Sequence, residues 1–488
     1  MSLPDSLPIA QEDWNQTPPA VQAVILAQAE AIRALRQEVE RLQGEVAELQ
    51  EQVGQNSTNS SRPPSSDLPG PPKRERTPSG RRPGGQPGHE GTHRRLKPVE
   101  EVKEVIPVKP QKCHQCGHGL AFEDPAPQRH QVTEIPPLVS ETTEYQLHTL
   151  ECPACGVRTR AQLEAGVPQG AFGPRLQAMV AILSGEYHLS KRQIEAMLLD
   201  FFGVELGLGS VWALEQTTSK ALTAPVEQAR AALKAQPVAN VDETSWPEGK
   251  QKGWMWFAVT EVVTVFLIRL SRGAKVAKEL LGETFSGVVG SDRWSGYNWV
   301  ATQQRQICWA HLLRDFEALI LRGGVSEQIG RALVFEAQQM FHLWHRVRDG
   351  TLDRASFQTQ MEVIQQQVGQ LLRKGAICDH PKTVRTCCNL LKLEAALWTF
   401  VRVEGVEPTN NAAERAVRSG VLWRKRSFGT QSTNGSEFVE RMMTVVASLR
   451  QQNRNVLSYL TAVCSAAIRG ENAPSLLPDA TVVSQTTS

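Results

Sequence analysis

Hydrophobic residues repeat with heptad spacing between Val21 and Val53. They form two interlocked series, Ile25, Ile32, Val39, Val46 and Val53, and Val21, Gln28, Leu35, Leu42 and Leu49. Branched residues in the first series and mostly leucine in the second favour a parallel two-stranded coiled coil. We therefore predict a coiled coil over residues 17–53 and a homodimer or higher oligomer. The alternative is one amphipathic helix that packs against its own chain.

The next segment, residues 54–98, is rich in Pro, Gly, Ser and Arg and has almost nothing to bury. This composition predicts a disordered linker. Between Arg62 and Lys97 there are nine Lys or Arg residues against three acids, a local balance of +6, which is typical of a nucleic-acid-binding arm. Arg81 and Arg82 are candidates for a DNA minor groove. A solvated tether that contacts DNA loosely is the alternative.

Two cysteine motifs follow, CHQCG with Cys113 and Cys116, and CPACG with Cys152 and Cys155. Because glycine ends each tight turn, both thiolates of a pair can bind one ion, and two such turns complete a tetrahedral site. We predict a structural Zn²⁺ in a zinc-ribbon domain over residues 99–165. Four cysteines without a metal are the alternative. Nine cysteines in 488 residues argue for thiols or metal ligands and against a disulfide framework.

Helical spacing then begins, in the segments GPRLQAMVAILSGEYHLS, SKRQIEAMLLDFFG and SVWALEQTTSKAL. The short connection VELGLG joins the last two. Two short helices around such a turn are typical of a helix-turn-helix, whose second helix reads a DNA groove. We predict a helical DNA-binding region over residues 170–236, although ordinary packing of three helices gives the same pattern.

The pattern changes to strands from residue 237. PVANVDETSW is apolar up to Asp242, GWMWFAVTE and VTVFLIRLS predict a meander, GAKVAKELLGETF a helix, and SGVVGSDRWSGY a strand that ends at Asp292. Three strands, a helix and a fourth strand open an α/β ribonuclease H-like fold, in which the first and fourth strands are neighbours. We predict this catalytic domain over residues 237–465, with a helical insertion at about 325–404.

Asp242 and Asp292 would then meet at one edge of the sheet, and Glu414 in PTNNAAERAVRSG is the candidate third acid. Three carboxylates suit Mg²⁺ or Mn²⁺. Two such ions can activate a water or a 3′ hydroxyl and stabilise the leaving oxygen of a phosphoryl displacement. Since Glu414 follows Asn411 by three residues, a capping box is the alternative.

The helix around Glu414 carries cations at 415, 418, 424, 425 and 426 and no acid from 415 to 426. A face of amide, carboxylate and cations suits a metal-bound phosphodiester better than a protein core. The predicted DNA contacts of this helix are Asn410, Arg418, Arg424 and Lys425.

Several segments in this order carry a family resemblance: NSSRPPSSD, GGQPGHEG, the paired CxxCG turns, VDETSW, SDRWSGY, CWAHLLRDF and TNNAAERAVR with RKRSFGT. Together they resemble the bacterial transposase of the insertion sequence 66 family, from the coiled coil to about residue 465. Arg62 stands where lysine is common in the family, which keeps the charge.

The resemblance implies a DDE transposase that acts on the terminal inverted repeats of its element and on target DNA. Its acidic triad falls on Asp242, Asp292 and Glu414. It also implies possible small accessory proteins encoded by the same element. Related transposases use insertions such as residues 325–404 to hold DNA ends, and support of the active site is the alternative here.

We therefore expect metal-dependent DNA cleavage at the ends of an insertion sequence and strand transfer into target DNA. A catalytically silent DNA-binding regulator and a structure-specific nuclease are the alternatives. Cys308 and His311 in CWAH have the spacing of metal ligands but offer only two groups, so burial beside the sheet is expected.

The remaining features concern location and the C-terminus. The net charge of +2 predicts no polyanion partner by itself, and no apolar run approaches the ~18 residues of a membrane span. We expect a cytoplasmic protein without membrane contact that associates with the nucleoid when bound to DNA. Residues 466–488 are expected to form a disordered tail.

Overall fold

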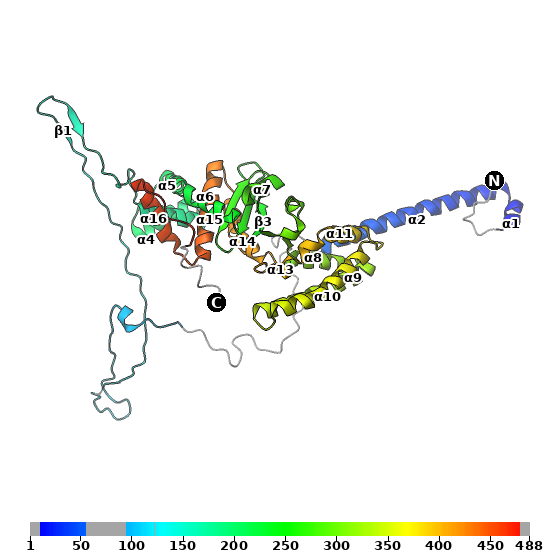
Figure 1. Cartoon of the computed structure of the whole chain (residues 1–488), viewed down its shortest axis with the longest axis horizontal. Coiled ribbons are helices and arrows are strands. Elements are labelled where there is room, and N and C mark those ends of the chain that lie inside the picture. Colours follow the sequence, from blue (N-terminus) through cyan, green and yellow to red (C-terminus); the bar gives the residue numbers. More distant parts are fainter. Residues whose placement is uncertain (1–9, 55–93, 122, 479–488) are drawn as a thin grey trace.

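The computed structural model describes residues 10–54, 94–121 and 123–478. After α1 (Gln11–Gln16), the 36 residues of α2 (Pro19–Gly54) form one continuous helix that projects from the rest of the chain (Figure 1). The hydrophobic residues of its two heptad series, called the stripe below, are largely exposed to solvent: the exposed fraction is 65% for Leu35 and 51% for Val46. The predicted helix is therefore present with its hydrophobic stripe uncovered, and its pairing with a second copy stays a prediction.

The segment from residue 94 to 169 forms an extended arm (Figure 1). It contains the 3-10 turn η2 (Val99–Glu101) and a two-stranded antiparallel sheet of β1 (Thr149–Glu151) and β2 (Arg158–Arg160). Most of the predicted linker, with Arg81 and Arg82, lies outside the described residues.

Four helices cover the predicted 170–236 region: α3 (Pro174–Gly185), α4 (Lys191–Phe202), α5 (Leu208–Ala221) and α6 (Thr223–Lys234). A capping box of Ser190 and Gln193 begins α4, and Gly203 ends it with a φ of 62°, a value that glycine adopts without strain. Ile194, Leu198 and Val211 are fully buried where α3, α4 and α5 pack. A helix, a turn and a helix therefore occur where the sequence predicts them.

The main sheet has five strands: β3 (Val238–Ser245), β4 (Trp254–Val259), β5 (Thr264–Arg269), β6 (Val288–Ser291) and β7 (Arg305–Ile307). Their order is β5-β4-β3-β6-β7. The meander β3–β5 is antiparallel, whereas β6 is parallel to both β3 and β7. The predicted neighbourhood of the first and fourth strands is confirmed, with α7 (Ala274–Leu281) between β5 and β6 in the chain.

Edge strand β5 is covered by α15 (Thr433–Gln451). Backbone N–H groups of Thr264, Phe266 and Ile268 donate to side-chain oxygens of Ser448, Thr444 and Glu440, at 3.1, 3.0 and 2.8 Å. Residues four apart lie on one helix face, so α15 satisfies the donors that an edge strand otherwise exposes. The helices α14 (Asn411–Ser427) and α16 (Val456–Arg469) complete this part of the chain.

The prediction of a disordered tail is wrong for residues 466–478. Helix α16 continues to Arg469, and Leu476 is fully buried in the main core. The carbonyl of Leu476 accepts hydrogen bonds from Gln452 and Arg454, at 3.1 and 3.2 Å. One leucine thus fixes a segment whose composition is otherwise that of a loop, and residues 479–488 lie outside the described residues.

The chain between β7 and α14 is helical, as predicted for residues 325–404. It comprises α8 (Trp309–Ile320), α9 (Gly324–Arg348), α10 (Arg354–Gly375), α11 (Pro381–Lys392), α12 (Glu394–Leu397) and α13 (Thr399–Arg402). These helices share a second core, in which Leu333, Met340 and Phe357 are fully buried. Their two ends meet, because the Trp309 N–H donates to the Pro408 carbonyl at 2.9 Å.

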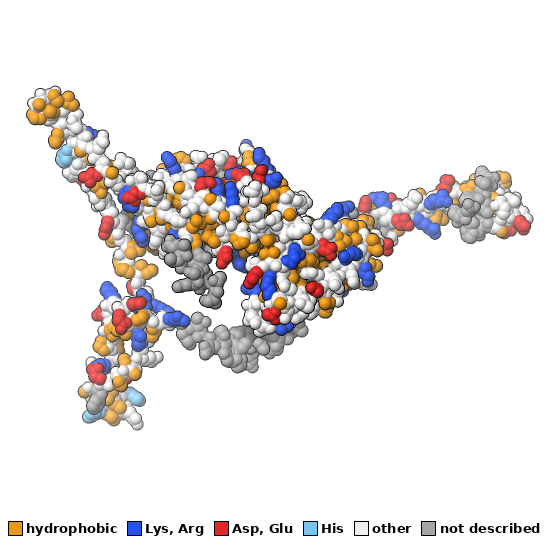
Figure 2. Space-filling view, viewed as in Figure 1, with side chains coloured by type: hydrophobic (Ala, Val, Ile, Leu, Met, Phe, Trp, Pro, Cys, Tyr) orange, Lys and Arg blue, Asp and Glu red, His pale blue; other side chains and the backbone are white. Residues whose placement is uncertain are grey.

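Acidic and basic side chains are interspersed over the visible face of the sheet and helical regions (Figure 2). Among the described residues, no helix has the length and hydrophobicity needed to span a membrane.

The close contact of α8 and α9 generates a stability prediction. A Cβ added at Gly330 would lie 2.8 Å from the Phe316 carbonyl oxygen and 2.9 Å from the Ile320 backbone nitrogen. Because backbone atoms cannot move aside cheaply, Gly330→Ala should lower the free energy of unfolding by about 1–3 kcal/mol. The same change at Gly209 meets nothing within 4 Å, so Gly209→Ala should be neutral or stabilise by up to about 1 kcal/mol. Equal thermal shifts for the two variants would contradict this account of the helix crossing.

Candidate active site

Asp242 and Asp292 lie at the same end of the main sheet, toward the C-terminal ends of the neighbouring strands β3 and β6. Asp242 is in the C-terminal half of β3, and Asp292 directly follows β6, the parallel neighbour of β3. The Asp242 carboxylate accepts the backbone N–H of Glu243 at 2.8 Å, and Asp292 accepts that of Trp294 at 3.0 Å. Each acid therefore has a local donor that fixes its orientation.

Glu414 enters from the first turn of α14, which begins beside β3 because Asn410 holds it there. Asn410 is 1% exposed, and its side-chain amide donates to the Val241 carbonyl at 2.8 Å. The residue after Val241 is Asp242, so this bond fixes the start of the Glu414 helix next to the first acid. The capping alternative is not supported, since α14 has no side-chain cap hydrogen bond and Glu414 contacts Arg314 and His311 instead.

The three predicted acids influence one another electrostatically. Burial raises the pKa of Asp242 well above its usual range, and the carboxylates of Glu243, Asp292 and Glu414 raise it further. Like charges held close together favour either a proton or a cation between them. Among the described residues these three carboxylates do not form a group within 4.8 Å of one another.

Glu243 directly follows Asp242 on β3. Its carboxylate pairs with Arg272 at 2.8 Å and accepts the Tyr297 hydroxyl, also at 2.8 Å. The Arg272 guanidinium lies over the rings of Trp254 and Trp294, 4.6 and 4.8 Å from their centroids. Burial raises the pKa of Glu243, whereas Tyr297 and Arg272 lower it. Glu243 thus has hydrogen-bond and ion-pair partners of its own.

Arg305 is a fully buried cation beneath Asp292 that the sequence did not single out. Its Nη2 donates to the carbonyls of Asp292 and Trp294 at 2.9 and 3.0 Å. Its Nη1 and Nε donate to Asn298 and Ser291 at 2.9 and 3.2 Å. Burial lowers the pKa of Arg305 to about 10, which leaves the guanidinium charged at neutral pH. One side chain therefore holds the loop that carries Asp292.

Helix α8 connects the second and third acids. Arg293, the neighbour of Asp292, pairs with Asp315 of α8 at 2.6 Å. On the same helix, Arg314 lies 3.3 Å and His311 3.6 Å from the Glu414 carboxylate. Burial and then Arg314 lower the pKa of His311, and nearby carboxylates oppose this shift, so the imidazole is neutral at pH 7.

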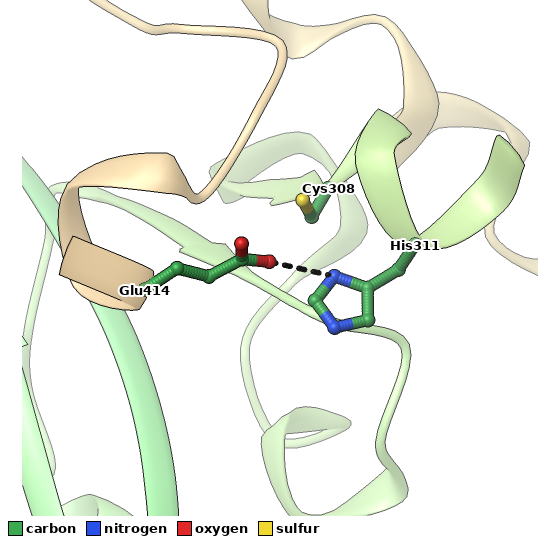
Figure 3. Close-up of side chains that lie close together, drawn as sticks. All are labelled: Cys308, His311 and Glu414. Carbon is green, nitrogen blue, oxygen red and sulfur yellow. Dashed lines mark ion pairs between the residues drawn. The ribbon is translucent and has the colours of Figure 1, made fainter. Parts of the chain in front are cut away.

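Cys308 and His311 have a place in this site that their spacing alone did not reveal. Cys308 precedes α8 and is buried as expected, and Figure 3 shows its side chain near those of His311 and Glu414. Its thiol accepts the backbone N–H of Asn410 at 3.1 Å, and burial raises its pKa to about 11. Burial is confirmed for Cys308, whereas the His311 side chain is 18% exposed, and the approach of Glu414 is an additional finding.

The predicted DNA contacts fall into three groups. Arg418 and Lys425 are exposed on α14. Asn410 is buried, and half-buried Arg424 donates to the Thr244 hydroxyl of β3 at 2.9 Å, so these two side chains fasten α14 to the sheet, and their DNA contacts stay a prediction. Arg81 and Arg82 lie outside the described residues.

The two cysteine turns have the expected local geometry. Gly117 and Gly156 have φ values of 75° and 69°, and their N–H groups donate to the carbonyls of Cys113 and Cys152 at 2.9 and 2.8 Å. The amides of Cys116 and Gln115 lower the pKa of Cys113, and those of Ala154 and Cys155 lower that of Cys152. Among the described residues, however, the two pairs are not brought together into one group of ligands. The shared Zn²⁺ stays a prediction.

Comparisons with known proteins bear on the class of this chain. The model of the Transposase IS66 family matches residues 169–438, and that of a family of unknown function (DUF6444) matches residues 16–95. An uncharacterized protein, y4qI, from Sinorhizobium fredii is 24% identical over 411 residues, which cover 76% of this chain and 73% of that protein. The match over more than half of the chain places it among the transposases. It belongs to the Transposase IS66 family, and the resemblance seen in the sequence is confirmed.

Substitution of Arg305 tests whether this side chain holds the loop that carries Asp292. Arg305→Met keeps much of the side-chain volume but leaves buried carbonyls unpaired, so the free energy of unfolding should fall by about 3 kcal/mol. Arg331 is an exposed arginine that pairs with Glu327 of its own helix, and Arg331→Met should change stability by less than about 0.5 kcal/mol. Chemical denaturation measures both values. Equal stability of the two variants would show that Arg305 does not hold the Asp292 loop.

Proposed function

We propose that this protein is a DNA transposase that uses Mg²⁺, or Mn²⁺, to cleave DNA at the ends of an insertion sequence and to join the freed 3′ hydroxyls to target DNA. Membership of the transposase family supports the general activity. The observation that carries the specific mechanism is the convergence of Asp242, Asp292 and Glu414 at one edge of a sheet in which β3 and β6 are parallel. The catalytic domain is proposed to be ribonuclease H-like over residues 237–465.

The donor set suits hard divalent cations. Asp242, Asp292 and Glu414 offer carboxylate oxygens, and their mutual repulsion is relieved when a cation lies between them. Bound ions would lower the pKa of the attacking water or 3′ hydroxyl and stabilise the leaving oxygen. The chain's own task is to hold the acids in place: Asn410 fixes the start of α14, and Arg305 fixes the loop after β6. No covalent nucleophile from the protein is needed.

DNA is the proposed partner, as terminal repeats and as target. Arg418 and Lys425 are exposed on the helix that carries Glu414 and are suited to bind phosphates beside the acids. Helices α4 and α5 are proposed to read a groove as a helix-turn-helix, and the basic segment with Arg81 and Arg82 to contact DNA. Cys113, Cys116, Cys152 and Cys155 are proposed to bind a structural Zn²⁺, which requires the two turns to approach each other. Small accessory proteins of the same element are possible further partners.

Single acid-to-amide changes test the triad. Asp242→Asn, Asp292→Asn and Glu414→Gln keep side-chain size but remove the anionic oxygens, so Mg²⁺-dependent cleavage should fall by orders of magnitude in all three. Glu404→Gln is the matched control, because Glu404 is exposed and has no part in the proposed site, and it should keep full activity. The assay follows cleavage of DNA that carries the repeats flanking the gene.

Two outcomes would change the assignment. Substantial activity of Glu414→Gln beside two inactive Asp variants would remove Glu414 from the triad. Supplying precut ends with a target plasmid separates a transposase from a structure-specific nuclease, because a nuclease yields no joined product.

The exposed stripe of α2 generates a separate prediction about assembly. Leu35 is 65% exposed and belongs to the stripe, so Leu35→Lys should place a charge in the dimer seam and convert the full-length protein to a monomer. Gln37 lies on the outer face of the same helix, and Gln37→Lys should leave the dimer intact. Light scattering coupled to size-exclusion chromatography measures the mass. A monomeric wild-type protein at high concentration would exclude the coiled coil.

A further inference from the structure

Three potential metal ligands meet beside the proposed triad. Cys308 precedes α8, His311 is in the first turn of α8, and Glu414 is in the first turn of α14 (Figure 3). One sulfur, one imidazole nitrogen and one carboxylate oxygen all lie within 4.8 Å of one another. Among the described residues they are the one such group of three, and two of its members have no part in the proposed Mg²⁺ chemistry.

The Cys308 sulfur is buried at the start of α8. It accepts the backbone N–H of Asn410 at 3.1 Å. Burial keeps the free thiol protonated, so the thiolate forms only when a bound metal ion displaces the proton. The geometry resembles a metal-binding turn, in which a helix start presents Cys and His three residues apart.

The imidazole has an unused ligand atom. His311 Nδ1 is buried and has no hydrogen-bond partner, although buried polar atoms are nearly always paired. It faces the Glu414 carboxylate at 3.6 Å (Figure 3). A bound cation between these side chains would satisfy Nδ1 and neutralise the carboxylate at once.

We propose that Cys308, His311 and Glu414 form a binding site for Zn²⁺ and that Zn²⁺ bound there inhibits the transposase by withdrawing Glu414 from the Mg²⁺ site. Thiolate and imidazole select Zn²⁺ over Mg²⁺ because they are softer ligands than oxygen. Three protein ligands with a fourth position left to water are common for zinc. The inhibitory part rests on the proposed function, whereas the binding part does not.

Binding requires small changes at the site. Ligand atoms of a tetrahedral zinc site lie about 3.5 Å apart, given bonds of about 2.0–2.3 Å, so the group must contract. Glu414 can supply this movement, because its side chain is 37% exposed and its pair with Arg314, at 3.3 Å, is loose. The Cys308 thiol loses its proton to solvent when the S–Zn bond forms.

The first measurement counts zinc in the full-length protein after equilibration with free Zn²⁺ and gel filtration. Cys308→Ser and His311→Gln should each hold about one ion per chain less than the wild type. Cys388→Ser is the matched control, since Cys388 lies on α11 away from the group, and it should bind as many ions as the wild type. His311→Gln also covers the case in which Cys308→Ser fails to fold. Wild-type zinc content in a folded His311→Gln would overturn the site.

The second measurement is Zn²⁺ inhibition of Mg²⁺-dependent cleavage, with each variant normalised to its own zinc-free rate. The Zn²⁺ concentration that halves cleavage should rise about tenfold or more in Cys308→Ser and His311→Gln, and added Mg²⁺ should relieve inhibition of the wild type. Cys152→Ser, which affects only the predicted zinc ribbon, should be inhibited like the wild type. If variants that no longer bind Zn²⁺ at this site are inhibited by Zn²⁺ as strongly as the wild type, Zn²⁺ does not act by competing with Mg²⁺ for Glu414. If the wild type does not cleave DNA, the inhibitory part fails with the proposed function, and the zinc count still decides whether the site exists.

Discussion

The hydrogen bond from the Asn410 side chain to the Val241 carbonyl is the interaction on which the candidate site depends. Glu414 is far from Asp242 in the chain, and a large helical insertion separates it from the last strand. Because Asn410 is fixed to the residue before Asp242, α14 begins at the correct edge of the sheet. Arg424 repeats the attachment further along α14 through Thr244. Both side chains are DNA-contact candidates in the sequence, and each also donates a hydrogen bond to β3.

Charge balance is the second constraint on the site. Four carboxylates, those of Asp242, Glu243, Asp292 and Glu414, affect one another here. Cations from different elements offset part of this repulsion: Arg272 pairs with Glu243, Arg314 with Glu414, and Arg305 lies under the Asp292 backbone. Within the part of the chain that the structure describes, no arginine is hydrogen bonded to Asp242, and burial and the other carboxylates raise its pKa well above the usual range. A cation bound beside Asp242 would offset the repulsion from the other three carboxylates.

The sequence predicted those features that local pattern determines. Heptad spacing predicted α2, and strand and helix periods predicted the order of elements in the sheet and the helical insertion. Features that depend on distant partners were missed or misassigned. Arg305 is an arginine in a short strand, and its burial follows only from the acceptors that the loop after Asp292 turns toward it. Leu476 is a leucine in a loop-like segment, and its burial follows only from packing against distant residues of the main core.

The cysteine residues illustrate the same limit. The CxxCG spacing defines each turn, and the turns are present, but spacing along the chain does not determine how two distant turns approach each other. For Cys308 and His311 the situation is reversed. Their spacing offered too few ligands for a site, and the third ligand comes from a helix that lies beyond the insertion.

The contact between Trp309 and Pro408 has a consequence for how this chain can vary. The polypeptide leaves the sheet and returns to it at the same point, and the helices between have a core of their own. The entropy of closing such a loop grows only with the logarithm of its length. Changes in length are therefore tolerated best in α9–α11, because α8 contacts Arg293 and Glu414 and α12 and α13 pack against β7.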